Sequence, residues 1–268
     1  MKIVLILVLA VLIFLFLIMP RLKRPKSKVF EQKYFAHRGL HDNETDRPEN
    51  SIRAFAYAVE NNYGIELDVQ LSKDAKMLVF HDDDLKRVCG VEGKIADYTF
   101  AELNEFRLLN TDQKIPLFTE VLKVIDGKVP LIVELKPYDN PSKLADMTND
   151  ILLDYNGIYC VESFNPFAIR WYKWKRPDII RGQLSGNLNR SSKDKKISYF
   201  FCRSLIFNLF SRPDFISYDF EDEKDIPFRL DTHLFKAVAV AWTIKTQAEL
   251  DKSKKEFDIF IFEGFIPK

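Results

Sequence analysis

Acidic side chains lie within or near the end of two short apolar stretches of this 268-residue chain. Glu66 and Asp68 lie two residues apart, so on a β-strand both would point to the same face. Glu134 ends another apolar stretch. Carboxylates brought to one buried place repel each other and require a compensating cation. Because all of these ligands are oxygens, the residue types predict a hard divalent ion, Ca²⁺ or Mg²⁺, rather than zinc.

Two histidines and two basic residues accompany the carboxylates. His37 and His81 each end a short apolar stretch, and an imidazole titrates near neutral pH, which suits a general acid and a general base. Arg38 and Lys136 can form charge-assisted hydrogen bonds with a phosphate group. A divalent ion beside them could polarise a phosphoryl oxygen and orient the attacking and leaving groups. Together, these residue types predict cleavage of a phosphodiester.

These side chains need a scaffold that brings their strands together. The turn at residues 72–75 is too short for a parallel crossover, which needs about a dozen residues, so the third strand must fold back as a hairpin arm. The others suffice to close a TIM-type (α/β)8 barrel, whose active site lies at the carboxyl ends of its strands. The strands are predicted at residues 34–38, 64–69, 77–81, 131–135, 158–163, 179–183, 214–218, 237–242 and 258–262.

The length suits one large domain or two small ones, and the composition suits a substantial core. Hydrophobic residues make up 47% of the chain, and 23 residues are Phe. The formal net charge of +1 argues against a nucleic-acid partner, because proteins that bind the phosphate backbone usually carry a basic excess. The widely spaced cysteines indicate neither a zinc site nor a redox pair. Helices are predicted at residues 51–61, 99–105, 119–125, 141–155, 166–174 and 246–254.

The N-terminal region differs in character from the rest. Residues 3–19 carry no polar side chain and as a helix would span about 25 Å, the lower end of the range for crossing a bilayer. We therefore predict a transmembrane anchor at residues 1–20, because Met19-Pro20-Arg21 is a poor signal-peptide cleavage site. Residues 21–33 form a basic juxtamembrane linker that could hold anionic lipid headgroups. The positive-inside bias then places the domain at residues 34–268 in the cytoplasm.

A second apolar run, at residues 199–210, leaves two alternatives open. As a helix it could dip into a lipid headgroup region or guide a lipid tail to the barrel mouth. It could equally pack as a helix of the barrel or cover it. The first alternative would favour a lysophospholipid substrate over a water-soluble diester. Among the basic residues just before this run are Lys193, Lys195 and Lys196.

Short motifs between residue 34 and about residue 243 resemble, in family order, those of the glycerophosphodiester phosphodiesterase family. Their combination is specific, although each is weak alone. They are Ala36-His37-Arg38-Gly39, Arg47-Pro48-Glu49-Asn50-Ser51, residues 66–74, His81-Asp82, Leu85 with Arg87, Ile115-Pro116, Glu134-Leu135-Lys136-Pro137, Ser163-Phe164 and Trp242-Thr243. The family often has Asn at the position of Lys245, and its last strand commonly ends in Thr-Asp where this chain has Phe262-Glu263.

The resemblance implies a role for each matching residue. His37 and His81 would be the catalytic pair, and Glu66, Asp68 and Glu134 would hold the metal. Arg38 and Lys136 would bind phosphate, while Phe164 and Trp242 would wall the pocket. Two residues stay ambiguous: Glu49 could assist the metal or form a structural hydrogen bond near an Asn50 cap, and His41 could reach the phosphate or lie in a loop.

The implied reaction converts glycerophosphodiesters to an alcohol and glycerol 3-phosphate. Either water or the substrate's own glycerol hydroxyl would attack phosphorus, the latter through a cyclic phosphate. A lysophospholipase D or phospholipase C-like activity on membrane lipids is the alternative on the same scaffold. A catalytically silent membrane-bound module that senses phosphodiesters or binds partners is the alternative from another class. The sequence names no protein partner.

Overall fold

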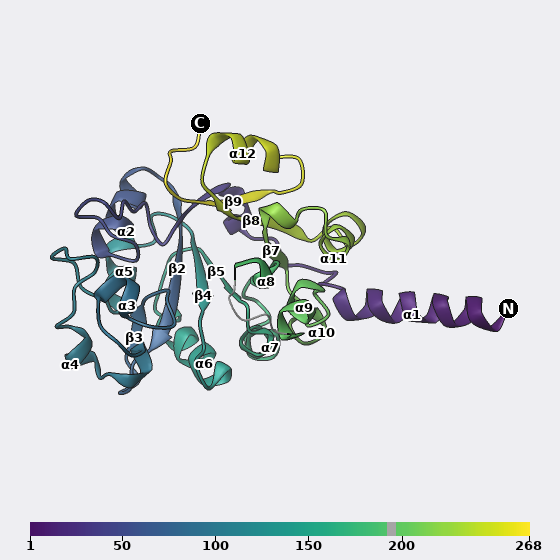
Figure 1. Cartoon of the computed structure of the whole chain (residues 1–268), viewed down its shortest axis with the longest axis horizontal. Helices are drawn as coiled ribbons and strands as arrows, with labels where there is room; N and C mark the ends of the chain where they lie inside the picture. The colour runs from purple at the N-terminus through teal and green to yellow at the C-terminus, as the bar shows by residue number, and fades with distance from the viewer. Residues whose placement is uncertain (192–196) are drawn as a thin grey trace.

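The computed structural model describes residues 1–191 and 197–268, in which the strands form one sheet (Figure 1). Lys193, Lys195 and Lys196 lie outside the described residues. The strands are β1 (Tyr34–His37), β2 (Gly64–Leu71), β3 (Met77–Val79), β4 (Leu131–Leu135), β5 (Tyr159–Ser163), β6 (Arg181–Ser185), β7 (Phe215–Asp219), β8 (Val238–Ile244) and β9 (Ile259–Phe262).

The sheet closes on itself because β1 pairs in parallel with both β2 and β9. The remaining strands complete the circle in the order β9, β8, β7, β6, β5, β4 and β2, each pair of neighbours parallel. Among the strands of the described residues, only β3 runs antiparallel, placing Val79 opposite Val69 of β2. The predicted (α/β)8 barrel and its hairpin arm are therefore confirmed. The short turn at residues 72–75 explains the arm, since it leaves no length for a crossover.

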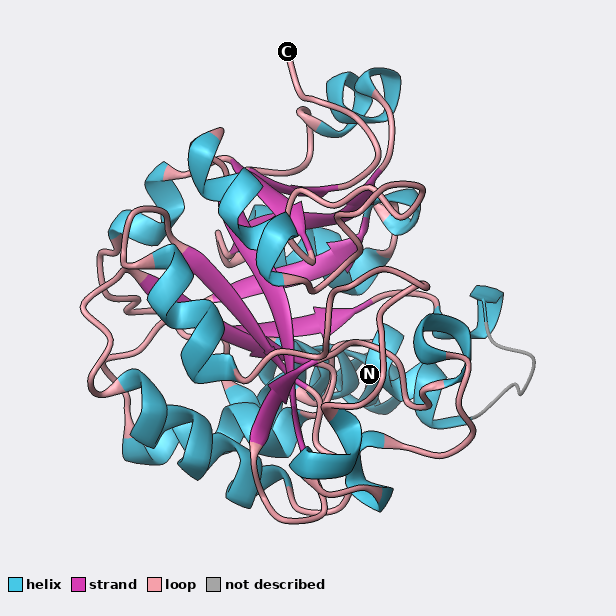
Figure 2. Ribbon diagram, turned by 90° about the vertical axis from the view of Figure 1, so that its left-hand side faces the viewer, coloured by secondary structure: helices cyan, strands magenta, loops and turns pink. Residues whose placement is uncertain are grey.

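Helices surround the barrel (Figure 2). Several are capped by polar side chains; in α2, for example, Ser51 Oγ accepts a hydrogen bond from the Ala54 amide at 3.1 Å. The α-helices are α1 (Lys2–Ile18), α2 (Ile52–Glu60), α3 (Lys86–Cys89), α4 (Phe100–Leu103), α5 (Phe118–Ile125), α6 (Pro141–Leu152), α7 (Pro166–Lys175), α8 (Leu188–Ser191), α9 (Ile197–Arg203), α10 (Asn208–Ser211), α11 (Ile226–Arg229) and α12 (Gln247–Ser253). Three 3-10 helices occupy Lys28–Glu31, Ile95–Asp97 and Phe220–Asp222, and a π-helix occupies Leu230–Leu234.

Alternation along the strands separates an outer core from the barrel interior. On β2, the odd-numbered Ile65, Leu67 and Val69 belong to the apolar layer shared with the surrounding helices. On β4, Leu131 and Val133 join that layer, whereas Ile132 packs inside the barrel with residues such as Phe35 and Phe215. The even-numbered acidic residues of both strands therefore share the interior face, and they lie near its carboxyl end.

The segment that follows the hairpin arm has a small core of its own. Leu78, Phe80, Leu85 and Ile95 pack together with other apolar residues up to Ile115. This cluster anchors the end of β3 next to β2, where Phe80 N donates to Asp68 O at 3.0 Å. As a result, the chain just after Phe80 is held over the carboxyl end of the barrel.

The prediction of a transmembrane anchor is wrong. Among the described residues, no helix has both the length and the apolar character needed to cross a membrane. Helix α1 has 17 residues, and its last turn is used for packing: Ile18 is fully buried, and its carbonyl accepts a hydrogen bond from Asn208 at 2.8 Å. The apolar run at residues 3–19 therefore includes residues that contact α10. The part of the helix outside this contact is shorter than about 25 Å, the length that the whole run would span. The predicted cytoplasmic orientation, which depended on this anchor, loses its basis with it.

The basic stretch at residues 21–33, predicted to hold lipid headgroups, contacts the barrel, and the apolar run at residues 199–210 is partly buried against it. In the basic stretch at residues 21–33, Arg21 donates to Pro177 O at 2.7 Å and lies 3.6 Å from the Asp214 carboxylate. The apolar run at residues 199–210 falls within α9 and α10 and the turn between them, with Leu205 buried in the core. Leu205 packs as the second alternative predicts, whereas Phe200 is 63% exposed, so both alternatives for that run stay open.

Candidate active site

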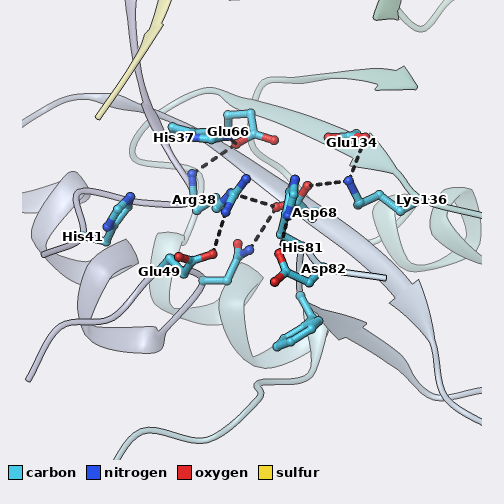
Figure 3. Close-up of polar contacts among 12 residues, drawn as sticks. His37, Arg38, His41, Glu49, Glu66, Asp68, His81, Asp82, Glu134 and Lys136 are labelled. Carbon is cyan, nitrogen blue, oxygen red and sulfur yellow. Dashed lines mark hydrogen bonds and ion pairs between the residues drawn. The ribbon is translucent and has the colours of Figure 1, made fainter. Parts of the chain in front are cut away.

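The carboxylates predicted to bind metal meet at the mouth of the barrel (Figure 3). Glu66 and Asp68 come from β2 and Glu134 from β4, where Asp68 and Glu134 are register partners. Their ligand oxygens all lie within 4.8 Å of one another, and the residues are buried. Parallel pairing of adjacent strands, together with the two-residue spacing on β2, thus places the three on one interior face.

Burial and mutual repulsion perturb the titration of these acids. Burial, followed by repulsion from Asp68 and Glu134, raises the pKa of Glu66 well above its usual value. Burial also raises the pKa of Glu134 to about 7. Burial opposes ionisation of Asp68 as well, but His81, Lys136 and Arg38 outweigh it and hold its pKa below the usual range. The cluster therefore resists carrying its full negative charge without a further cation.

The donor set fits a divalent metal ion. All of its ligand atoms are carboxylate oxygens, the type that Ca²⁺ and Mg²⁺ prefer. Asp68 Oδ1 is buried and has no hydrogen-bond partner in the described part of the chain, so it has an unused acceptor within the cluster. Asp68 Oδ2 accepts a hydrogen bond from Asn50 Nδ2 at 2.9 Å, which orients the carboxylate. Asn50 thus serves the acidic cluster, and Ser51 rather than Asn50 caps α2.

The two histidines border the same cavity at the barrel mouth. This cavity has a volume of about 80 Å³, and its lining includes His37, His81, Glu66 and Glu134. His37 ends β1, while His81 follows the hairpin arm. Each ring has a carboxylate at Nδ1: Glu263 Oε2 lies 2.5 Å from that of His37, and Asp82 Oδ1 lies 2.7 Å from that of His81. The Nε2 atom of each ring is the one left for a substrate.

Basic side chains flank the carboxylates. Arg38 lies in the turn after β1 with a positive φ of 56°, and its amide donates to Glu66 Oε2 at 3.1 Å. Its Nε has no hydrogen-bond partner among the residues described and lies 3.9 Å from Asp68 Oδ2. Lys136 Nζ lies 3.4 Å from Glu134 Oε1 and 3.7 Å from Asp68 Oδ1. Both cations therefore sit beside the acidic cluster with donor capacity to spare.

Aromatic side chains form one wall of the cavity. Phe164, after β5, and Trp242, on β8, contact each other edge to face, with ring centroids 5.6 Å apart and planes at 89°. Phe164 also borders a second cavity of about 370 Å³, together with Glu134, Lys136 and Tyr138. The structure thus brings together all the residues predicted for the site, at one end of the barrel.

A network of charges behind the cavity was not anticipated. Arg87 donates to both oxygens of Glu49, at 2.8 and 2.6 Å, and to both oxygens of Asp82, at 2.6 and 2.8 Å. Glu49 Oε1 also accepts from Arg38 at 2.6 Å. Glu49 is therefore a link between Arg38 and the segment that carries His81, and it is not part of the carboxylate cluster. The quoted motifs include Arg87 and Asp82, but only the fold shows that they meet.

Two further carboxylates reach the site without having been predicted. Glu162 on β5 is the register partner of Glu134 and lines the same cavity, so strand alternation could have suggested it. Burial, followed by repulsion from Glu134, raises the pKa of Glu162 well above its usual value. Glu263 follows β9 and contacts His37, and its only signal in the sequence was a departure from the family pattern. His41, left ambiguous before, has its Nε2 3.7 Å from Glu263 Oε2.

The fold and the site define a TIM barrel with an acidic, cation-binding mouth flanked by two imidazoles. The chain belongs to the glycerophosphoryl diester phosphodiesterase family, whose model matches residues 37–211. That range includes His37, His81 and all three carboxylates of the cluster, but it ends before Trp242 and Glu263.

Curated relatives share parts of the chain. A glycerophosphodiester phosphodiesterase of Bacillus altitudinis is 37% identical over 39% of this chain and 44% of its own length. One from Caldanaerobacter subterraneus is 33% identical over 56% of this chain and 65% of its own length. The human lysophospholipase D GDPD1 is 29% identical over 50% of this chain and 45% of its own length. The chain thus spans about half the length of the curated relatives it matches.

Solved structures show the same barrel. The glycerophosphodiester phosphodiesterase of Thermotoga maritima superposes with a TM-score of 0.66 and 28% identity, covering 86% of this chain and 94% of that one. An Oleispira antarctica phosphodiesterase in complex with the product sn-glycerol-3-phosphate gives a TM-score of 0.68 with 22% identity, covering 86% and 92%. At that lower identity, the second comparison supports the fold alone.

Proposed function

We propose that this chain is a metal-dependent hydrolase of glycerophosphodiesters, yielding an alcohol and glycerol 3-phosphate. The observation that carries the proposal is the cluster of Glu66, Asp68 and Glu134, with oxygens within 4.8 Å of one another, next to two carboxylate-held imidazoles. Membership of the glycerophosphoryl diester phosphodiesterase family supports the substrate class. The catalytic domain would comprise residues 34–268, and residues 21–33 would be the linker before it.

Each residue of the site would have a defined task. Glu66, Asp68 and Glu134 would hold Ca²⁺ or Mg²⁺, which when bound would polarise a phosphoryl oxygen. Arg38, whose Nε makes no hydrogen bond to the residues that the structure describes, and Lys136 would hold the phosphate oxygens by charge-assisted hydrogen bonds. These two cations also lower the repulsion between the phosphate and the carboxylates.

The histidines would move the protons. His37 and His81 face the same cavity, so one can take a proton from the attacking oxygen while the other gives one to the departing alcohol. Phe164 and Trp242 would wall the cavity, hold the substrate's carbon skeleton and limit the access of water. The catalytically silent alternative loses support from this arrangement, because both imidazoles and all three carboxylates lie together.

The test is an assay of purified protein on glycerophosphodiesters with different alcohols, with release of glycerol 3-phosphate as the readout. Turnover should vanish with a chelator and return when Mg²⁺ or Ca²⁺ is added back. The variant Glu66→Gln should remain folded and inactive under every metal condition. Absence of chelator-sensitive turnover on every diester would contradict the proposal.

A second candidate, lysophospholipase D activity, is favoured by one comparison. The human relative of that name aligns over 50% of this chain, and the second cavity of about 370 Å³ next to the site offers room for a larger group. Adding lysophospholipids to the panel separates the alternatives: lysophosphatidic acid would indicate lysophospholipase D chemistry, and release of a phosphorylated headgroup would indicate phospholipase C-like chemistry.

A further inference from the structure

Two positions where the sequence departs from the family pattern contact each other in the structure. Lys245 follows β8, and Glu263 follows β9, the strand that pairs with both β8 and β1. Lys245 Nζ lies 2.9 Å from Glu263 Oε1, while Glu263 Oε2 lies 2.5 Å from His37 Nδ1. Lys245 and Glu263 therefore form a series of contacts that leads from solvent to His37, one of the two imidazoles of the site.

We propose that Glu263, itself held by Lys245, is a positioning residue that keeps the proton of His37 on Nδ1 and leaves Nε2 to exchange a proton with the substrate. This inference rests on the proposed hydrolase function. An ionised carboxylate can only accept hydrogen bonds, so the ring nitrogen facing it must be the donor. In a neutral imidazole the other nitrogen is then the acceptor, and the tautomer is decided.

The geometry around His37 agrees with this division of its nitrogens. Nδ1 points to Glu263, whereas Nε2 lies 3.9 Å from Glu66 Oε2, on the side of the acidic cluster. The His37 side chain is 14% exposed and that of Glu263 20%, so water competes little for their hydrogen bond. Burial opposes ionisation of Glu263, but the contacts with His37, His41 and Lys245 hold its pKa well below the usual range.

The ion pair of Lys245 with Glu263 is the weaker of these two contacts. The side chain of Lys245 is 63% exposed, and ion pairs of exposed residues contribute little on their own. It does occupy the second carboxylate oxygen, so Glu263 keeps the rotamer in which Oε2 faces His37. Asp82 has the corresponding place at His81, but it is the next residue in the chain, whereas Glu263 is 226 residues from His37.

The experiment compares full-length wild-type protein with the variants Glu263→Gln and Glu263→Asp. A glutamine keeps the shape but can turn its amide nitrogen toward Nδ1, which favours the opposite tautomer. An aspartate, the residue that the family commonly has here, keeps the carboxylate but is shorter by one carbon–carbon bond, about 1.5 Å. In Glu263→Gln we expect kcat to fall by at least about 100-fold with KM changed by less than about threefold, as for other carboxylates that orient a catalytic histidine, and in Glu263→Asp we expect a smaller loss.

The tautomer itself is read by ¹⁵N–¹H correlation spectra of the imidazoles. The chain has four histidines, so a His37→Gln spectrum identifies the signals of His37. We expect wild-type His37 to carry its proton on Nδ1 and the Glu263→Gln variant to lose that pattern. A wild-type spectrum with the proton on Nε2, or an unchanged spectrum and kcat in the variant, would overturn the inference.

Two more variants make the result specific. Glu256→Gln is a matched control, because Glu256 Oε2 lies 2.9 Å from Nε2 of the exposed His233, outside the cavity, and we expect its kcat to equal that of the wild type. Lys245→Asn should reduce kcat less than Glu263→Gln does, and should have no further effect in the Glu263→Gln background. Equal losses in both backgrounds would show that Lys245 acts independently of Glu263.

The readouts also separate this inference from the function on which it rests. If the wild type turns over no diester, the proposed function fails, while the His37 spectrum still reports the tautomer. If the wild type is active and His37 has the opposite tautomer, the function stands and the role of Glu263 fails. Melting curves of each variant show that the fold is retained, and the wild-type spectrum decides the tautomer even if a variant does not fold.

Discussion

The substitution Glu134→Gln should stabilise the metal-free protein at alkaline pH. Glu134 is buried beside Asp68 and Glu66, and without a bound cation its negative charge is unfavourable there. A glutamine keeps the side-chain length and removes the charge. Lys136 loses one partner at 3.4 Å but keeps Asp68 at 3.7 Å, so no buried charge is left alone.

The size of the effect follows from the titration of Glu134. Its pKa rises from 4.5 to about 7 on folding, chiefly through burial, which corresponds to about 3 kcal/mol at about 1.4 kcal/mol per pH unit. Between pH 4.5 and about 7 the folded state binds the proton that the unfolded state has released, so the free energy of unfolding falls as the pH rises. The free energy of unfolding of the variant does not fall in this way. The variant should therefore be no more stable than the wild type below pH 4.5, and should reach its full extra stability above about pH 8.

Thermal unfolding in the presence of a chelator measures this difference. For a chain of this size, about 3 kcal/mol corresponds to an increase in melting temperature of about 6–10 °C at pH 8. Adding Mg²⁺ or Ca²⁺ should narrow the difference, because the wild type gains about 2.7 kcal/mol at a metal concentration of about 100 Kd and the variant gains less. Glu60→Gln, at an exposed position, is the control. Equal melting temperatures in chelator at pH 8, or a difference that persists at pH 4, would refute the reasoning.

Three further predictions concern activity. His81→Gln should lower kcat by about 10²–10⁴-fold with the fold retained, and steady-state rates within tenfold of wild type would contradict its acid–base role. Arg87→Lys should lower kcat by about 10–100-fold, because a single ammonium cannot hold Glu49 and Asp82 through four hydrogen bonds. A rate assay measures this loss, and a metal titration should show unchanged metal affinity. Phe164→Leu should raise KM about fivefold, because loss of the edge-to-face contact with Trp242 costs about 1 kcal/mol, which corresponds to that factor. A change in kcat alone would argue against a role of Phe164 in substrate binding.

The barrel could be predicted from the sequence because it follows from local rules. Strand periodicity put Glu66 and Asp68 on one face, and parallel pairing of β2 with β4 added Glu134 to it. The short turn before Met77 required a hairpin arm, which carries His81 to the same end of the sheet. Each of these inferences uses only neighbours along the chain and the fact that parallel strands share their carboxyl edge.

The errors arose where packing overrides local pattern. Hydropathy treats residues 3–19 as one apolar run, but Ile18 belongs to the contact with α10, and the remaining length falls short of a span. For the apolar run at residues 199–210, where the sequence left two alternatives open, Leu205 packs in the barrel's outer core. An apolar sequence reports only that a surface avoids water, and it does not say which partner covers that surface.

The residue types and their spacing by themselves predicted the fold class and the three carboxylates, two imidazoles and two basic side chains of the proposed site. Only the tertiary structure decided which carboxylate serves which histidine. Glu263 reaches His37 from 226 residues away, and Arg87, which also binds Asp82, reaches Glu49 from 38 residues away, through pairings that leave no periodic trace in the chain. The physical reason is that a hydrogen bond depends on positions within a few tenths of an ångström, and these are set by the closure of the barrel and not by neighbours in sequence.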